Sequence, residues 1–141
     1  MRLSEHFTLQ EFERSRKAQE LGIDNHVPAR LIPALEQLCQ QVLEPLRLYA
    51  EEPVVISSGY RCPRLNRLVG GALLSQHVKG EAADIRIPDR LTGMRWFAWL
   101  MENTTFDQLI WEHRRPSTYW IHVSCRKDLT LNRHQVLFVR K

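Results

Sequence analysis

The chain contains no long apolar run, no CxxC pair and no block of like charges. A membrane-crossing helix needs about 20 apolar residues, so we expect no membrane span and no membrane partner. Residues 1–6 lack the apolar stretch of a secretory signal, which predicts synthesis in the cytoplasm without a signal peptide. The three cysteines, Cys39, Cys62 and Cys125, are an odd set that favours reduced thiols over a disulfide framework.

Internal repeats, low-complexity segments and Pro/Gly/Ser-rich linkers are also missing. The 141 residues therefore predict a single domain, 1–141, that is large enough to bury a core. A formal net charge of +4 favours polyanionic surroundings, such as wall polymers or nucleic acid. Because there is neither a Lys/Arg run nor the pattern of a nucleic-acid module, we expect no specific nucleic-acid partner.

The apolar periodicity predicts both helices and strands. Thr8 and Glu11 have the capping-box spacing, which predicts a short helix through Phe12 and Ala18. A stripe of apolar residues over 32–48 predicts the main core helix, which Pro45 would kink or end. Further helices are predicted over 63–69 and 91–101, the latter with Met94, Phe97, Ala98 and Met101 buried, and strands over 53–57, 82–87, 106–111, 119–124 and 135–139. This order predicts an α+β fold, a small and largely antiparallel sheet with helices packed on one side.

Two histidines and one carboxylate form a candidate zinc site. His77 and Asp84 are seven residues apart, with Gly80 allowing a turn between them, and alternation over 82–87 places Asp84 on the polar face of a strand. His122 can approach from a neighbouring strand. A zinc held by three protein ligands keeps a fourth position for water, which is the catalytic arrangement. Taken singly, each of these residues is more often a surface or hydrogen-bonded group than a ligand.

Three short motifs in order connect these residues. Residues 58–61 read SGYR, residues 75–84 read SQHVKGEAAD and residues 120–122 read WIH. Together with the opening residues 3–9 and the GGA of 70–72, they resemble the zinc D-Ala-D-Ala carboxypeptidase family, the M15 peptidases, and especially its small single-domain branch in bacteria and phages.

The resemblance implies a fold of the hedgehog/D-Ala-D-Ala-peptidase type with one zinc ion, Zn2+, per chain. The implied ligands are His77, Asp84 and His122. The implied activity is hydrolysis of a peptide bond in the stem or cross-link peptides of peptidoglycan, by a carboxypeptidase or an endopeptidase. A phage or prophage lysis enzyme, acting at the cell wall after phage-type release, is one setting, and a chromosomal role is another.

The chain departs from the family at the general base. Many members carry an acidic residue three positions before the last histidine, and here that position is Tyr119. Glu112 ends the preceding strand and would face the same pocket across a hairpin, so we predict it as the base. A solvated Glu112 at a loop edge is the alternative, and His113 as a substrate group is a weaker one.

Other residues near the motifs have predicted roles. The resemblance implies that Arg61 holds the substrate's carboxylate or polarises its carbonyl; a helix-capping or surface ion-pair role is the alternative. Ser75 would bind substrate or orient the loop that carries His77. Trp120 would contact substrate, in an aromatic wall with Trp111 and Tyr119. The alternative is that these three aromatic residues belong to the ordinary core. Cys62 is a structural thiol or, less favourably, a metal ligand.

Two rival functions are compatible with the sequence. One is a zinc-containing wall-binding module that has lost hydrolysis, which Tyr119 supports. The other is a virion-associated module that uses the fold for assembly. The sequence carries no signal for an oligomeric state.

Overall fold

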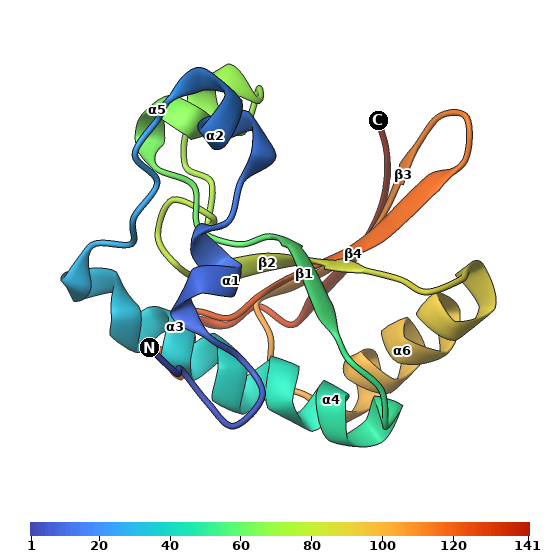
Figure 1. The fold of residues 1–141 in the computed structure, drawn as a ribbon. Helices are drawn as coiled ribbons and strands as arrows, with labels where there is room; N and C mark the ends of the chain where they lie inside the picture. Colours follow the sequence, from blue (N-terminus) through green and yellow to red (C-terminus); the bar gives the residue numbers. More distant parts are fainter.

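A five-stranded sheet in the order β1-β2-β4-β3-β5 organises the chain (Figure 1). The structure, a computed structural model, describes residues 1–141. The strands are β1 (Val55–Ser58), β2 (Ala82–Arg86), β3 (Gln108–Arg114), β4 (Thr118–Ser124) and β5 (Gln135–Arg140). All neighbours pair antiparallel except β3 and β5, which run parallel. The mixed α+β architecture and the largely antiparallel sheet are therefore confirmed.

Helical segments occupy much of the remaining chain. The α-helices are α1 (Leu9–Glu13), α2 (Arg16–Leu21), α3 (Ile32–Leu38), α4 (Glu44–Ala50), α5 (Pro63–Leu68) and α6 (Arg90–Asn103). Two short 3-10 turns, η1 (Ala29–Leu31) and η3 (Leu129–Leu131), and one π-helical turn, η2 (Cys39–Leu43), complete the set. None of these helices has both the length and the apolarity to cross a membrane.

The segment α3-η2-α4 forms the main core helix. It runs along one side of the sheet together with α6, whereas α2 and α5 lie apart from this layer (Figure 1). Its apolar stripe is fully buried, as predicted: Leu35, Leu38, Val42, Leu43 and Leu46. Pro45 does not end the helix. It lies at the start of α4, directly after the π-helical turn, and the helix continues to Ala50.

Two local predictions were wrong. The expected single helix through Phe12 and Ala18 is two helices, because Ser15 is extended and its side chain caps α2 by accepting from the Ala18 N–H. In α6 the buried residues are Gly93, Trp96, Phe97 and Leu100, so Phe97 is buried as predicted, whereas Met94 is 54% exposed and Ala98 is exposed too. A side chain at Gly93 would collide with Ile87, so the close approach of the chain after β2 fixes this rotation.

The pairing of β2 with β4 separates core from site. Asp84 lies directly opposite His122, while the flanking pairs, Ala83 with Val123 and Ile85 with Ile121, are completely buried in the core. Since side chains alternate along a strand, Asp84 and His122 lie on the opposite face of the sheet. The predicted hairpin of β3 and β4 is confirmed, and in it Glu112 pairs with Trp120.

Candidate metal centre

His77, Asp84 and His122 meet on the sheet face away from the core. Asp84 Oδ1 lies 3.1 Å from His122 Nδ1 and 3.5 Å from His77 Nε2. One ligand atom from each residue lies within 4.8 Å of the others. The structure thus brings together the three residues that the sequence pointed to, as a group able to hold a metal ion.

The loop before β2 holds His77 in a ligand orientation. Its Nδ1 lies 2.7 Å from the carbonyl oxygen of Gly59, an acceptor, so the proton is on Nδ1 and Nε2 keeps its lone pair. That Nε2 is buried and has no hydrogen-bond partner. A buried imidazole nitrogen with a free lone pair beside a carboxylate is what a divalent metal ion requires, so the residues fit zinc.

Two glycines make this loop conformation possible. Gly80 has a φ of +69°, in the left-handed region that favours glycine, and it turns the chain from His77 into β2. Gly59 packs so closely on α1 that a Cβ would lie 2.7 Å from the Cα of Phe12. This packing fixes the carbonyl that orients His77.

Burial and neighbouring charges have opposite effects on the pKa values of Asp84 and Arg61. Burial by itself would raise the pKa of Asp84, but the two histidines outweigh it and hold the pKa well below its ordinary range. Arg61 Nη2 lies 3.7 Å from Asp84 Oδ2. Burial lowers the pKa of Arg61, while Asp84 and Glu112 act in the opposite direction. Asp84 is therefore a carboxylate at neutral pH, which is the form that binds metal.

Besides its contact with Asp84, Arg61 donates hydrogen bonds to two further side chains. Its Nε donates to Ser58 Oγ at 3.3 Å and its Nη1 to Asn66 Oδ1 at 3.1 Å. A guanidinium has five N–H donors, so further donors remain beside Asp84. Ser75 Oγ accepts from the backbone N–H of His77 at 3.2 Å, which is the loop-orienting contact that the sequence offered as one of two options.

Glu112 lies beside the three candidate ligands and is buried rather than solvated. It is 5% exposed, and its Oε1 is 4.0 Å from His122 Nδ1. Its Oε2 is 3.0 Å from the ammonium of Lys141. Trp120, the cross-strand partner of Glu112, has the cations of Arg114 and Lys141 over its ring.

Three other predicted neighbours do not join the site. Tyr119 and Trp111 alternate with Trp120 and Glu112 along their strands, so they lie on the helix side, where Phe97 packs on Trp111. The expected wall of three aromatic side chains is therefore wrong. His113 stacks on Tyr119, with ring centroids 4.2 Å apart, and it too lies away from the metal centre.

Cys62 has a structural role. Its Sγ accepts from the Leu65 N–H and caps α5, outside the group of metal-ligating residues. It is a structural thiol, and the alternative of a metal ligand is wrong.

Two residues near the site, Asn66 and Lys141, were not predicted from the sequence. Asn66 is buried and connects Arg61 to the carbonyl of Ala72, yet within the sequence it is one polar residue of a short helix. Lys141 lies far from every motif, and only the parallel pairing of β5 with β3 brings it to Glu112.

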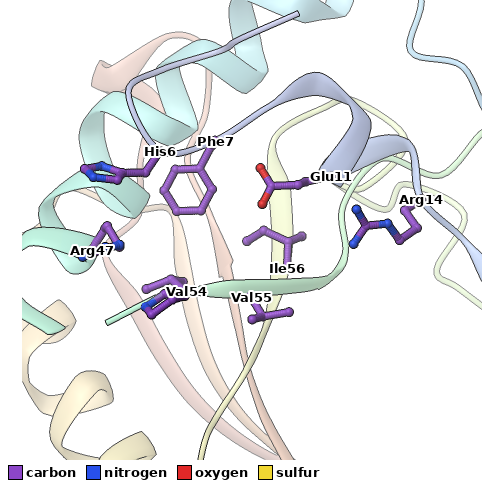
Figure 2. A pocket seen from close by; sticks show the side chains of 9 residues that line it. His6, Phe7, Glu11, Arg14, Arg47, Val54, Val55 and Ile56 are labelled. Carbon is purple, nitrogen blue, oxygen red and sulfur yellow. The ribbon is translucent and has the colours of Figure 1, made fainter. Parts of the chain in front are cut away.

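Two cavities are relevant to the location of the site. One of about 510 Å³ reaches the metal centre, and its lining is Ala72, Leu74, Ser75, Gln76, Lys79, Gln108, Ile110, His122, Arg126 and Arg133. The other, of about 360 Å³, lies between the N-terminal segment with α1 and the strand β1 (Figure 2). It contains none of the three candidate ligands, so the first cavity is the one that belongs to the site.

Comparisons with known proteins agree with this geometry. No curated protein matches the chain. The family model described as Peptidase M15 matches residues 5–124, which include all three candidate ligands, Arg61 and Glu112. That match supports a peptidase. The chain belongs to the Peptidase M15 family.

Proposed function

We propose that this protein is a zinc-dependent peptidase that hydrolyses a peptide bond in the stem or cross-link peptides of peptidoglycan. The observation that carries the metal assignment is the buried His77 Nε2, which has no hydrogen-bond partner and faces Asp84 and His122. Family membership supports the peptidase class. The peptidoglycan substrate rests on the resemblance of residues 58–61, 75–84 and 120–122 to the family motifs.

His77, Asp84 and His122 would hold the ion. A bound zinc supplies Lewis acidity, which polarises a scissile carbonyl and lowers the pKa of water to about 7. The protein's part is orientation: the Gly59 carbonyl fixes the tautomer of His77, and cross-strand pairing fixes Asp84 opposite His122. Strand pairing keeps Asp84 and His122 in register, and such fixed positioning favours catalysis.

Glu112 would act as the general base. Its Oε1 is on the same face as His122, and from there it would accept a proton from the attacking water and pass it to the leaving amine nitrogen. Lys141 pairs with the other oxygen of this carboxylate, which leaves Oε1 directed at the site. The position three residues before His122 could not serve, because Tyr119 lies on the other face of the sheet.

Arg61, Ser75 and Trp120 complete the assignment. The remaining N–H donors of Arg61 would bind a carbonyl or carboxylate oxygen of the peptide, next to Asp84. Ser75 lines the cavity at the site and would bind substrate in addition to holding the backbone of His77. Trp120 would contact the substrate from the same face as Glu112.

A second candidate is a zinc-containing module without hydrolysis, bound to the cell wall or to a virion. The ion pair between Lys141 and Glu112 favours it, because it gives this carboxylate a structural contact that needs no catalysis. As a peptidase the protein would act at the cell wall, in a phage or prophage setting or in a chromosomal one.

Digestion of purified wall fragments by the zinc-loaded protein, followed by mass spectrometry, tests the proposal. We expect new peptide termini with the wild type and none with His77→Ala, which should also lose its zinc. His26→Ala removes an exposed histidine outside the metal-ligating group and is the matched control. Wild-type protein that holds one zinc but releases no peptide would favour the inert module instead.

A further inference from the structure

The two edges of the sheet differ in how they are protected. β1 forms one edge, and its pairing with β2 is irregular between Ile56 and Ser58. Directly after β1, the backbone N–H of Tyr60 donates to the carbonyl of Phe12, which ties this edge to α1. β5 forms the other edge and pairs with β3 without interruption along its whole length. Irregular pairing and a covering segment both protect edge strands from further pairing, and β5 has neither.

Every second residue of β5 directs its backbone groups away from the sheet. The N–H groups of Gln135 and Lys141 donate to carbonyl groups of the β3 segment, at 2.9 and 2.7 Å. Because the backbone groups of successive residues point to opposite sides of a strand, those of Val136, Phe138 and Arg140 point outward. No strand lies on that side of β5. Three residues therefore offer backbone donors and acceptors along an open edge.

The side chains of β5 are apolar in the middle and cationic only at the end. Residues 136–139 read VLFV, without a charge or a proline. Phe138 is 73% exposed, and its ring centroid lies 5.5 Å from that of Phe97, on the helix side of the sheet. Lys141 lies on the other side, with Glu112. Charges or prolines usually interrupt an edge strand that stays unpaired, so the composition of β5 favours a paired one.

A second copy of β5 fits this edge in an antiparallel register. With Phe138 opposite its own equivalent, Val136 of each copy lies opposite Arg140 of the other. These are the residues whose backbone groups point outward, so each facing pair can exchange two hydrogen bonds. The two Phe138 rings then lie on the same face as direct neighbours, and each covers apolar surface of the other.

The same register suits the alternate residues of the strand. Leu137 lies opposite Val139 of the second copy, which is an apolar pair, and Gln135 lies opposite Lys141. Arg140 and Lys141 of one copy are at the opposite end of the pair from those of the other copy. Within residues 135–141, no like charges therefore face each other.

We propose that β5 is a dimerisation edge, at which two copies of this chain pair antiparallel through residues 135–141 and join their sheets into one. The two-fold axis of such a pair is perpendicular to the sheet, so both metal centres open on the same face. β3 separates β5 from β4 and β2, which carry His122 and Asp84, so the pairing leaves these side chains uncovered. The dimer is independent of the proposed peptidase function.

Sedimentation velocity of the full chain, from micromolar to millimolar concentration, tests the association. We expect the mass of two chains at the upper end. Phe138→Arg brings two cations together at the centre of the pair and should weaken dimerisation about tenfold. Leu48→Arg is the matched control, because Leu48 is 68% exposed on α4, and it should dimerise as the wild type does. A wild type that stays monomeric at millimolar concentration overturns the proposal, as does equal weakening by the two substitutions.

The register has a test of its own at Gln135, an exposed residue. Gln135→Glu places a carboxylate opposite Lys141 of the second copy at both ends of the pair, and it should strengthen dimerisation about fivefold. Gln135→Lys should weaken dimerisation by a similar factor. Gln19→Glu and Gln19→Lys make the same changes in net charge at an exposed position on α2. If the substitutions at Gln135 act no differently from those at Gln19, the register is wrong and the proposal falls.

Hydrogen exchange of single backbone amides identifies the strand that pairs. The amides of Val136 and Phe138 have an acceptor only in the dimer, so their exchange should slow about tenfold from dilute to concentrated protein. The amide of Leu137 faces β3 and should be protected at both concentrations. Association without added protection at Phe138 would place the contact on another surface and overturn the proposal.

Discussion

The two faces of the β2–β4 pair differ completely in chemistry. On the helix side Ile85, Ile121 and Val123 have no exposed surface, and on the other side Asp84 and His122 point at each other. Residues one position apart therefore serve separate purposes. The apolar face stabilises the fold by burial, and the polar face collects the three side chains that could hold an ion. Substitutions on the polar face should therefore change activity but not stability, and substitutions on the apolar face should change stability but not metal binding.

The largest expected effect is on the polar face. Glu112→Gln keeps the size of the side chain but removes the proposed base, so kcat should fall by about 10²–10⁴. Lys141, its ion-pair partner, has a half-exposed side chain that water can solvate, so the free energy of unfolding should change by less than about 1 kcal/mol. Steady-state kinetics on a stem peptide and urea unfolding measure the two quantities.

Glu102→Gln is the control for this change, since it alters an exposed carboxylate on α6. An active Glu112→Gln protein would remove Glu112 from the mechanism. A large loss of stability in Glu112→Gln would show that the polar face also contributes to the stability of the fold.

On the apolar face, Ile121→Ala should act on stability instead. The side chain is fully buried between β2 and β3, and truncation of such a residue lowers the free energy of unfolding by about 2–5 kcal/mol. The folded fraction should still bind one zinc per chain. Urea unfolding and metal analysis of the folded protein check both statements, with Thr118→Ala at the exposed start of β4 as the control. Loss of zinc from folded Ile121→Ala protein would contradict the comparison.

Asp107 is an intermediate case, because it is charged and yet structural. Burial would raise its pKa, but Arg133 and Arg126 outweigh burial and hold the pKa well below its ordinary value of about 3.9. Its carboxylate therefore contributes stability above about pH 4, and the contribution is lost as the pH falls toward the folded-state pKa. Asp107→Asn should cost about 2 kcal/mol at pH 7, as the loss of hydrogen bonds to charged groups does, and flatten the pH dependence of unfolding below pH 4.

Urea unfolding at several pH values between 7 and 2.5 measures this effect. The control is again Glu102→Gln, which should leave the pH dependence as in the wild type. If the free energy of unfolding of Asp107→Asn fell below pH 4 as steeply as that of the wild type, the two arginines would not be stabilising the carboxylate.

Local sequence patterns predicted part of the site, and contacts between distant segments account for the rest. Alternation and the family motifs located His77, Asp84 and His122, because strand period and loop glycines are local properties. The hairpin placed Glu112 opposite Trp120 for the same reason. The rotation of α6 depends on Gly93 meeting Ile87, and Lys141 reaches Glu112 only through a parallel edge strand. Such contacts depend on packing between distant segments, which periodicity does not encode.

The smallest effect is expected at Ser75, which holds the loop that carries His77. Its Oγ accepts from the His77 backbone N–H, and the loss of one such hydrogen bond costs about 1 kcal/mol. Ser75→Ala should therefore weaken zinc binding about fivefold, since 1.4 kcal/mol corresponds to a factor of ten. Competition with a chromogenic chelator measures the affinity, and Ser117→Ala at the hairpin tip is the control. An unchanged affinity, with cleavage of the stem peptide impaired, would assign Ser75 to the substrate instead of the loop.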